Sequence, residues 1–208
     1  MSVSLLQIVL LGFAASLTLI VAIGAQNAYL LRLGVEGRGR ILVTVILICA
    51  FSDAVLIAAG VAGIGALLER APAAIDVVRL LGALFLISYG VIAARRALNP
   101  RGMNMDESPA DASMKAIVLT TLAFTWLNPH VYLDTVMLLG SIANQQSGVD
   151  RWWWALGAAS ASFAWFFVLG YGARLLKPLF ARPAAWRVLD GLIAVIMISL
   201  GAGLIIGT

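Results

Sequence analysis

Residues 116–143 read AIVLTTLAFTWLNPHVYLDTVMLLGSIA, an apolar run that is longer than one membrane crossing needs and has Asn128-Pro129 close to its middle. A helix crosses the ~30 Å hydrocarbon core with about 20 apolar residues. Proline removes a backbone donor and clashes with the preceding turn, and Asn followed by Pro is an ordinary helix start. The stretch therefore predicts a membrane span that breaks near the bilayer midplane; a simple proline kink is the alternative.

Similar apolar runs recur along the whole chain. Of its 208 residues, 62% are apolar and only 12% are charged, against about 25% charged in a soluble domain, and the mean hydropathy is +1.01. Backbone groups in lipid must satisfy their own hydrogen bonds, so each run is expected to be a helix. The prediction is an all-α integral membrane protein with a single transmembrane domain over 1–208. The expected spans are 5–31, 41–68, 74–94, 116–143, 152–172 and 188–207.

The chain also shows weak internal similarity. A polar linker at about 99–114 separates two sets of three spans, at about 1–98 and 115–208. Each set has a serine eight residues before a glycine in its second span, and an asparagine in its first span. An odd number of spans per set predicts two inverted three-helix repeats, with broken helices at spans 1 and 4, an arrangement common in secondary transporters. Chance similarity among small residues is the alternative.

Basic residues predict the orientation of the spans. Six crossings place eleven of the 14 lysine and arginine residues on one side and three on the other. Cytoplasmic loops retain the excess of Lys and Arg. The large loops are therefore expected in the cytoplasm and both termini outside, and the net charge of +4 needs no nucleic-acid partner to explain it.

Two acids within the apolar runs are candidate functional groups. Asp53 is near the middle of span two and Asp134 lies well inside span four, and neither has a basic residue one helical turn away. A charge at the bilayer centre costs about 2.5–3.5 kcal/mol on insertion scales. Each acid is therefore expected to be protonated or to pair with a cation, which is either a ligand or a residue of another span. The alternative is a purely structural role, in which the neutral acid is hydrogen-bonded to a neighbouring helix. Asp76, Asp150 and Asp190 are expected to be helix caps or solvated charges.

Polar groups at the two expected breaks could meet a solute. A half-helix that starts at Asn128-Pro129 would aim free N–H groups inward, which suits a carboxylate. Gly24 permits local unwinding, and the adjacent amides of Gln26 and Asn27 are costly in lipid unless they are hydrogen-bonded. These amides could contact a polar substrate or tie helices together. Two unpaired acids and an anion site together indicate a transporter of a small charged or zwitterionic solute.

The remaining chemistry is sparse. His130 precedes Asp134 by four residues, so the pair could relay a proton or form a structural hydrogen bond. One histidine and the single Cys49 cannot form a zinc site, a disulfide framework or a redox pair. No Walker A loop, HExxH or GxSxG motif is present. We therefore expect neither an enzyme nor a cofactor or metal site.

Three motifs resemble those of the lysine exporter (LysE-type) family: GAQNA at 24–28, Ser52-Asp53, and WLNPHVYLD at 126–134. The similarity extends over essentially the whole chain. It implies export of L-lysine and L-arginine across the bacterial plasma (inner) membrane, using the electrochemical gradient and no ATP. Ala25 departs from the pattern, because many members have proline at this position, and this predicts a softer first break.

The sequence and the resemblance together give one prediction. The protein is expected to be a secondary exporter of basic L-amino acids that exchanges them for protons. Its expected surroundings are membrane lipid, and a homodimer is left open. The alternative cargo is a neutral amino acid or another small cation. The expected substrate-binding or proton-coupling residues are Gly24, Gln26, Asn27, Asp53, Asn128, Pro129, His130, Tyr132 and Asp134.

Overall fold

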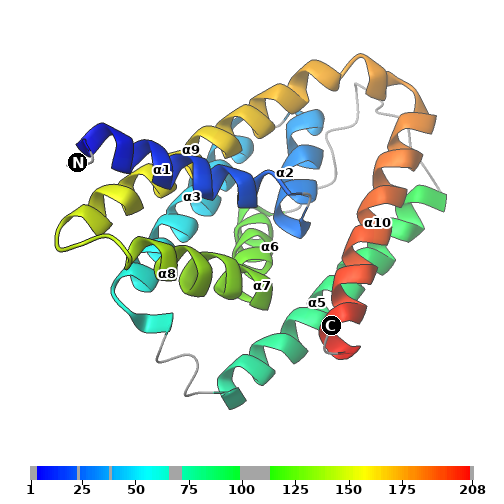
Figure 1. Cartoon of the computed structure of the whole chain (residues 1–208). Helices are drawn as coiled ribbons and strands as arrows, with labels where there is room; N and C mark the ends of the chain where they lie inside the picture. The colour runs from blue at the N-terminus through cyan, green and yellow to red at the C-terminus, as the bar shows by residue number, and fades with distance from the viewer. Residues whose placement is uncertain (1–3, 23, 38, 66–71, 99–112, 207–208) are drawn as a thin grey trace.

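The computed structural model describes residues 4–22, 24–37, 39–65, 72–98 and 113–206, and over these ranges it contains helices and turns without strands (Figure 1). This confirms the all-α prediction. Most of the expected polar linker, residues 99–112, lies outside the described residues. The helices are α1 (Leu5–Ile20), α2 (Ala25–Glu36), α3 (Gly39–Val61), α5 (Pro72–Leu98), α6 (Met114–Trp126), α7 (Pro129–Val131), the π-helix η1 (Tyr132–Leu139), α8 (Gly140–Ala143), α9 (Asp150–Gly172), the 3₁₀ turns η2 (Ala173–Leu176) and η3 (Leu179–Ala181), and α10 (Pro183–Ile206).

The first and fourth expected spans are both broken. Helices α1 and α2 meet at an angle of 82°, and the axis of α6 is bent by 55° from that of the segment Pro129–Ala143. At the second break Asn128 has extended backbone and Pro129 is the first helical residue, as the Asn-Pro pair predicts. At the first break α1 ends at Ile20 and α2 begins at Ala25, after Gly24, which has extended backbone. The break therefore precedes Gln26-Asn27, where the resemblance placed it.

The four remaining long helices, α3, α5, α9 and α10, are each long and apolar enough to cross a membrane, and counting each bent pair as one span gives up to six crossings. Two of these helices, α5 and α10, extend well beyond the ends of the expected spans. The last turn of α5 includes Arg95 and Arg96, and α10 begins at Pro183 rather than near 188. Hydropathy locates the apolar part of a helix, whereas proline at the first position or polar side chains at the end let the helix itself extend further.

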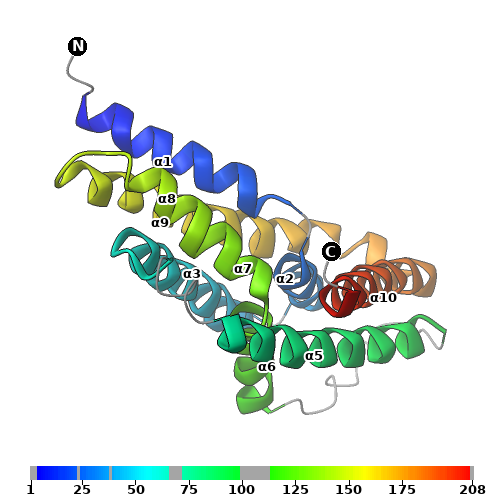
Figure 2. The same ribbon diagram turned by 60° about the horizontal axis from the view of Figure 1, so that its bottom comes forward.

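Segments far apart in the sequence lie side by side. Helix α1 packs along α9, and α5 packs along α10, so that α5 and α10 form a pair set to one side of the other helices (Figures 1 and 2). Helix α3 contacts α2, α6, η1, α8 and α9. It crosses the second broken span where Gly60 meets Gly140, since small residues let helix backbones approach closely.

This crossing predicts a stability effect for Gly60→Ala. A Cβ at Gly60 would lie 2.5 Å from the Val136 carbonyl oxygen and 3.1 Å from the Gly140 Cα, so α3 and η1 would have to separate. Overpacking of this kind costs about 1–3 kcal/mol, and we expect a lower melting temperature in detergent, followed by tryptophan fluorescence. Gly191→Ala is the matched control, because a Cβ there meets nothing within 4 Å. Equal melting temperatures of both variants would contradict the close crossing.

Candidate functional site

The two helix breaks border one cavity of about 270 Å³, close to the lower end of the range for small-molecule sites, about 300–1,000 Å³. The end of α1, the start of α2, the middle of α3 and α9, and the segment after the second break all contribute to its wall. Of the nine predicted site residues, seven line it and Pro129 and Tyr132 do not. The seven are Gly24, Gln26, Asn27, Asp53, Asn128, His130 and Asp134.

Asp53 provides a buried carboxylate on the cavity wall. It sits in the middle of α3 with 7% of its surface exposed, and it accepts a hydrogen bond from the Ser162 hydroxyl of α9. No lysine or arginine in the described part of the chain forms an ion pair with it. Ser162 also lines the cavity. Sequence reasoning missed it as a site residue, although its spacing to Gly170 matches that of Ser52 to Gly60.

Asp134 provides a second carboxylate on a different helix. It lies on the π-helix η1, and its side chain is exposed at the cavity wall. His130, also on the wall, is close enough to act on it electrostatically. A π-helix bonds residue i to i+5, is rare, and is frequent at functional sites. The hydropathy pattern of 116–143 contains no signal for this irregular winding.

Asn27 and Tyr132 support the two breaks. Asn27 Nδ2 donates to the carbonyls of Ile20 (2.7 Å) and Ala22 (2.8 Å), and its Oδ1 accepts from Trp165 Nε1 (3.3 Å). The Tyr132 hydroxyl donates to the Trp126 carbonyl at 2.8 Å. Carbonyls at the end of a helix have no partner within the helix, so both side chains satisfy groups that the breaks leave open. Of the two roles left open for Asn27, tying helices together fits these contacts.

The two helix starts at the breaks are capped differently. Asn128 Oδ1 accepts from the His130 backbone N–H at 3.1 Å, so the second break is capped by its own side chain. Helix α2 begins after Gly24 with no side-chain cap, and a Cβ at Gly24 would meet nothing within 4 Å. The buried Nε2 of Gln26 has no hydrogen-bond partner among the described residues. Donors for an anion are therefore available at α2, whereas the sequence pointed to Asn128-Pro129.

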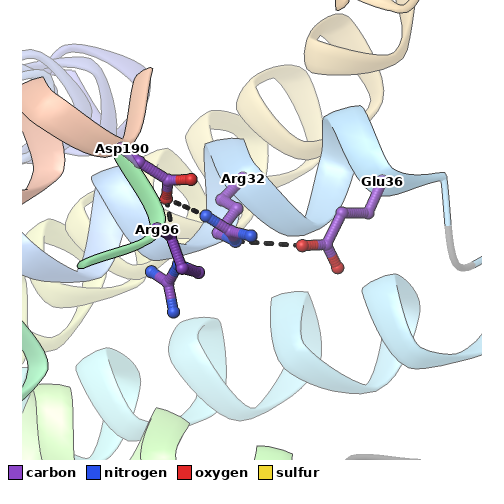
Figure 3. A network of polar contacts seen from close by, with 4 residues as sticks. All are labelled: Arg32, Glu36, Arg96 and Asp190. Atoms are coloured by element: carbon purple, nitrogen blue, oxygen red, sulfur yellow. Dashed lines mark hydrogen bonds and ion pairs between the residues drawn. The ribbon is translucent and has the colours of Figure 1, made fainter. Parts of the chain in front are cut away.

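A second group of charged side chains lies away from the cavity, around Asp190 of α10 (Figure 3). Asp190 is only 3% exposed and pairs with Arg32 of α2 and, at 3.2 Å, with Arg96 Nε of α5. Arg32 Nε also pairs with Glu36 at 2.9 Å. The prediction that Asp190 is a cap or a solvated charge is therefore wrong. Its partners are 158 and 94 residues away in sequence, so no local pattern reveals them.

Comparison with known protein families identifies the family of this chain. The model of the LysE type translocator family matches residues 17–208. The chain belongs to this family. All of the cavity wall except Ser16 falls within the matched region. Membership confirms the family predicted from the GAQNA and WLNPHVYLD motifs, and it makes the protein a translocator rather than an enzyme.

Relatives of this LysE type translocator are named for amino acids. A putative amino-acid transporter of Mycobacterium tuberculosis is 48% identical over 88% of this chain and 89% of its own. The lysine exporter LysE of Corynebacterium diphtheriae is 38% identical over 96% and 99%, respectively. The arginine exporter protein ArgO of Serratia proteamaculans is 39% identical over 93% of both chains. No solved structure matches the chain.

Proposed function

We propose that this translocator exports L-arginine and L-lysine from the bacterial cytoplasm and binds them in the cavity between the two helix breaks. The observation that carries the proposal is the charge of the described cavity wall: it includes two carboxylates, Asp53 and Asp134, and neither lysine nor arginine. An unpaired buried carboxylate is costly unless a cation reaches it. The names of the lysine and arginine exporters among the relatives support the same substrates.

The arrangement of polar groups fits a dibasic amino acid better than a neutral one. The substrate carboxylate would lie at the uncapped start of α2, beside the free Nε2 of Gln26. The two positive groups of arginine or lysine would pair with Asp53 and Asp134. A neutral amino acid has one positive group and would leave one acid without a partner, so the cavity should discriminate against it.

We also infer that the two halves of the chain are inverted repeats. The contacts come in matching pairs: α1 and α2 pack on α9, the second helix of the other half, while α6, η1 and α8 pack on α3. Likewise α2 contacts α10, and α7 contacts α5. Such pairing is what a pseudo-twofold relation between 1–98 and 115–208 would produce. It supports a rocking mechanism around a site at the repeat interface.

The membrane orientation follows the basic residues. Several of them gather at one end of the molecule: Arg32 and Arg96 meet at Asp190, and Arg174 lies beside Gly39. Our proposal places this end in the cytoplasm of a bacterium, in its inner membrane, in line with the excess of Lys and Arg in cytoplasmic loops.

Counterflow in vesicles of reconstituted protein tests the substrate class. Vesicles loaded with unlabelled arginine should take up labelled arginine and lysine at least about tenfold faster than labelled alanine, because alanine has one positive group and can pair with only one of the two acids. Protein-free vesicles give the background, and Asp76→Asn, an exposed acid of α5, is the matched variant that should behave like the parent. Equal rates for alanine would favour export of neutral amino acids, and uptake of Mn²⁺ alone would overturn the assignment.

A further inference from the structure

The ion network of Arg32, Glu36, Arg96 and Asp190 joins three helices that are separate in sequence. Asp190 of α10 is the shared carboxylate for Arg32 of α2 and Arg96 of α5 (Figure 3). The Arg32 guanidinium also lies over the Trp186 ring, 5.5 Å from its centroid. Buried ion pairs add little net stability because desolvation offsets their attraction, and their best-attested use is to select one arrangement. This network is therefore suited to holding α2, α5 and α10 together in one of two states.

An aromatic cluster lies beside the ion network. Tyr29 of α2, Tyr89 and Phe85 of α5, and Phe124 of α6 pack with ring centroids between 4.9 and 6.5 Å apart. The Arg96 guanidinium lies 5.4 Å from the centroid of the Tyr89 ring, so the cluster and the network are in direct contact. Tyr29 and Phe124 are buried. The rings therefore pack against one another where α2, α5 and α6 meet.

All three features follow one another along α2, and α5, α10 and the segment from α6 to Asn128 each carry two of them. On α2 the cavity residues at 24–27 come before Tyr29 of the cluster and Arg32 of the network. At 1.5 Å per residue, Gln26 and Arg32 are about 9 Å apart along the helix axis. On α10, Leu200 lines the cavity, and Asp190 lies about 15 Å away along the axis, in the network.

The other two helices agree. On α6, Phe124 of the cluster is one turn from Asn128 at the cavity. On α5, Phe85 and Tyr89 of the cluster come before Arg96 of the network. Helix α2 carries residues of all three features, and along it the aromatic cluster lies between the cavity and the ion network.

We propose that the aromatic cluster and the ion network form a gate, which closes the cavity on the side to which the C-terminal end of α2 points. Opening requires Asp190 to release Arg32 and Arg96, so that the α5–α10 pair moves away from α2. The buried Nη2 of Arg96 has no hydrogen-bond partner among the described residues, so the closed state leaves one donor of the gate without a hydrogen bond. Figure 1 shows α5 and α10 packed together at one side of the fold, and in the proposed opening they move as a pair.

The gate also fits the proposed cargo, and in this respect it rests on the proposed function. Arginine carries the same guanidinium as Arg32 and Arg96. A substrate arriving at this side can therefore compete with them for Asp190 and can stack on the same aromatic rings. The cargo would loosen the contacts that close its own route, while a neutral amino acid would not.

Cysteine labelling tests the gate without any substrate. Cys49→Ser removes the only cysteine, Thr135→Cys places a reporter on the cavity wall, and Arg182→Cys, exposed just before α10, marks the gated side. A membrane-impermeant methanethiosulfonate reagent is applied to right-side-out and inside-out vesicles. We expect Asp190→Asn to increase labelling at position 135 from the gated side by about tenfold or more, because Arg32 and Arg96, both part-buried, lose their shared carboxylate.

Control variants separate the gate from general loosening. Asp190→Glu keeps the carboxylate, and Asp76→Asn removes an exposed acid that pairs with Arg79 at 3.5 Å; both should label like the parent. If Asp190→Asn does not fold, the triple change Arg32→Gln, Arg96→Gln and Asp190→Asn removes both ion pairs of Asp190 together with the two guanidinium groups, and it should open the same side. Unchanged labelling in the folded variant overturns the gate. If the parent protein shows no arginine counterflow while Asp190→Asn still increases labelling at position 135, the proposed function is overturned and the gate is retained.

Discussion

Replacing Asp53 by asparagine is expected to reduce arginine efflux by about 30-fold or more, the equivalent of the ~2–5 kcal/mol that truncating one partner of a buried charge pair costs. Asparagine has the same shape and can still accept the hydrogen bond of Ser162, so the helix contacts of α3 should persist. The variant lacks only the negative charge that would hold the substrate cation. Efflux from preloaded cells, normalised to the amount of protein in the membrane, measures the effect.

Two further variants show whether the charge or the packing matters. Ser162→Ala removes the hydroxyl but keeps the carboxylate, and it should slow efflux far less than Asp53→Asn does. Asp134→Asn should also have the smaller effect, because Asp134 is exposed and solvent screens its charge. Normal efflux by a well-expressed Asp53→Asn protein would show that the carboxylate is structural and would remove the central support for a cationic substrate.

Much of this site could be predicted from the sequence because its signals are local. Asn128-Pro129 is a helix start by the properties of the two residues alone, and the structure breaks the span there. Glycine and two amides in an apolar run indicated the other break, and Gln26 and Asp53 both line the cavity. An acid in an apolar run is improbable without a function, so composition alone directs attention to Asp53.

Other parts depend on contacts that no local pattern contains. Asp190 looks like an ordinary acid near a helix start, and only the packing of α2 and α5 against α10 makes it the centre of a buried network. Asn27 was expected as a polar group that could face the substrate or tie helices together. Its side-chain amide is hydrogen-bonded to the carbonyls of Ile20 and Ala22 and to the indole N–H of Trp165. Likewise, the free helix start is at α2 because Asn128 caps its own helix. For Asp190 the packing of distant helices decided the role, and for Asn27 and Asn128 the hydrogen-bond partners decided between roles that the residue type left open.

The energy source of export can be argued from the same two acids. The membrane potential opposes the exit of a cation by about 2.3 kcal/mol per charge per 100 mV when the inside is negative, so a uniporter for arginine would run inward. A carboxylate taken out of water requires a compensating positive charge or a proton. When arginine leaves Asp53 and Asp134, a proton can take its place and return to the cytoplasm. One proton exchanged for one singly charged arginine would move no net charge, and the pH gradient alone would then drive export.

Vesicles clamped at zero potential should therefore accumulate arginine against its gradient when a proton gradient is imposed in the opposite direction, and each arginine should be accompanied by one proton. Potassium and valinomycin hold the potential, labelled arginine reports its flux, and a trapped pH dye reports the proton. The Asp53→Asn variant is the control, since it should abolish both fluxes together. Arginine accumulation that requires an imposed potential and proceeds without proton movement would mean that these carboxylates bind the cargo but do not exchange it for protons.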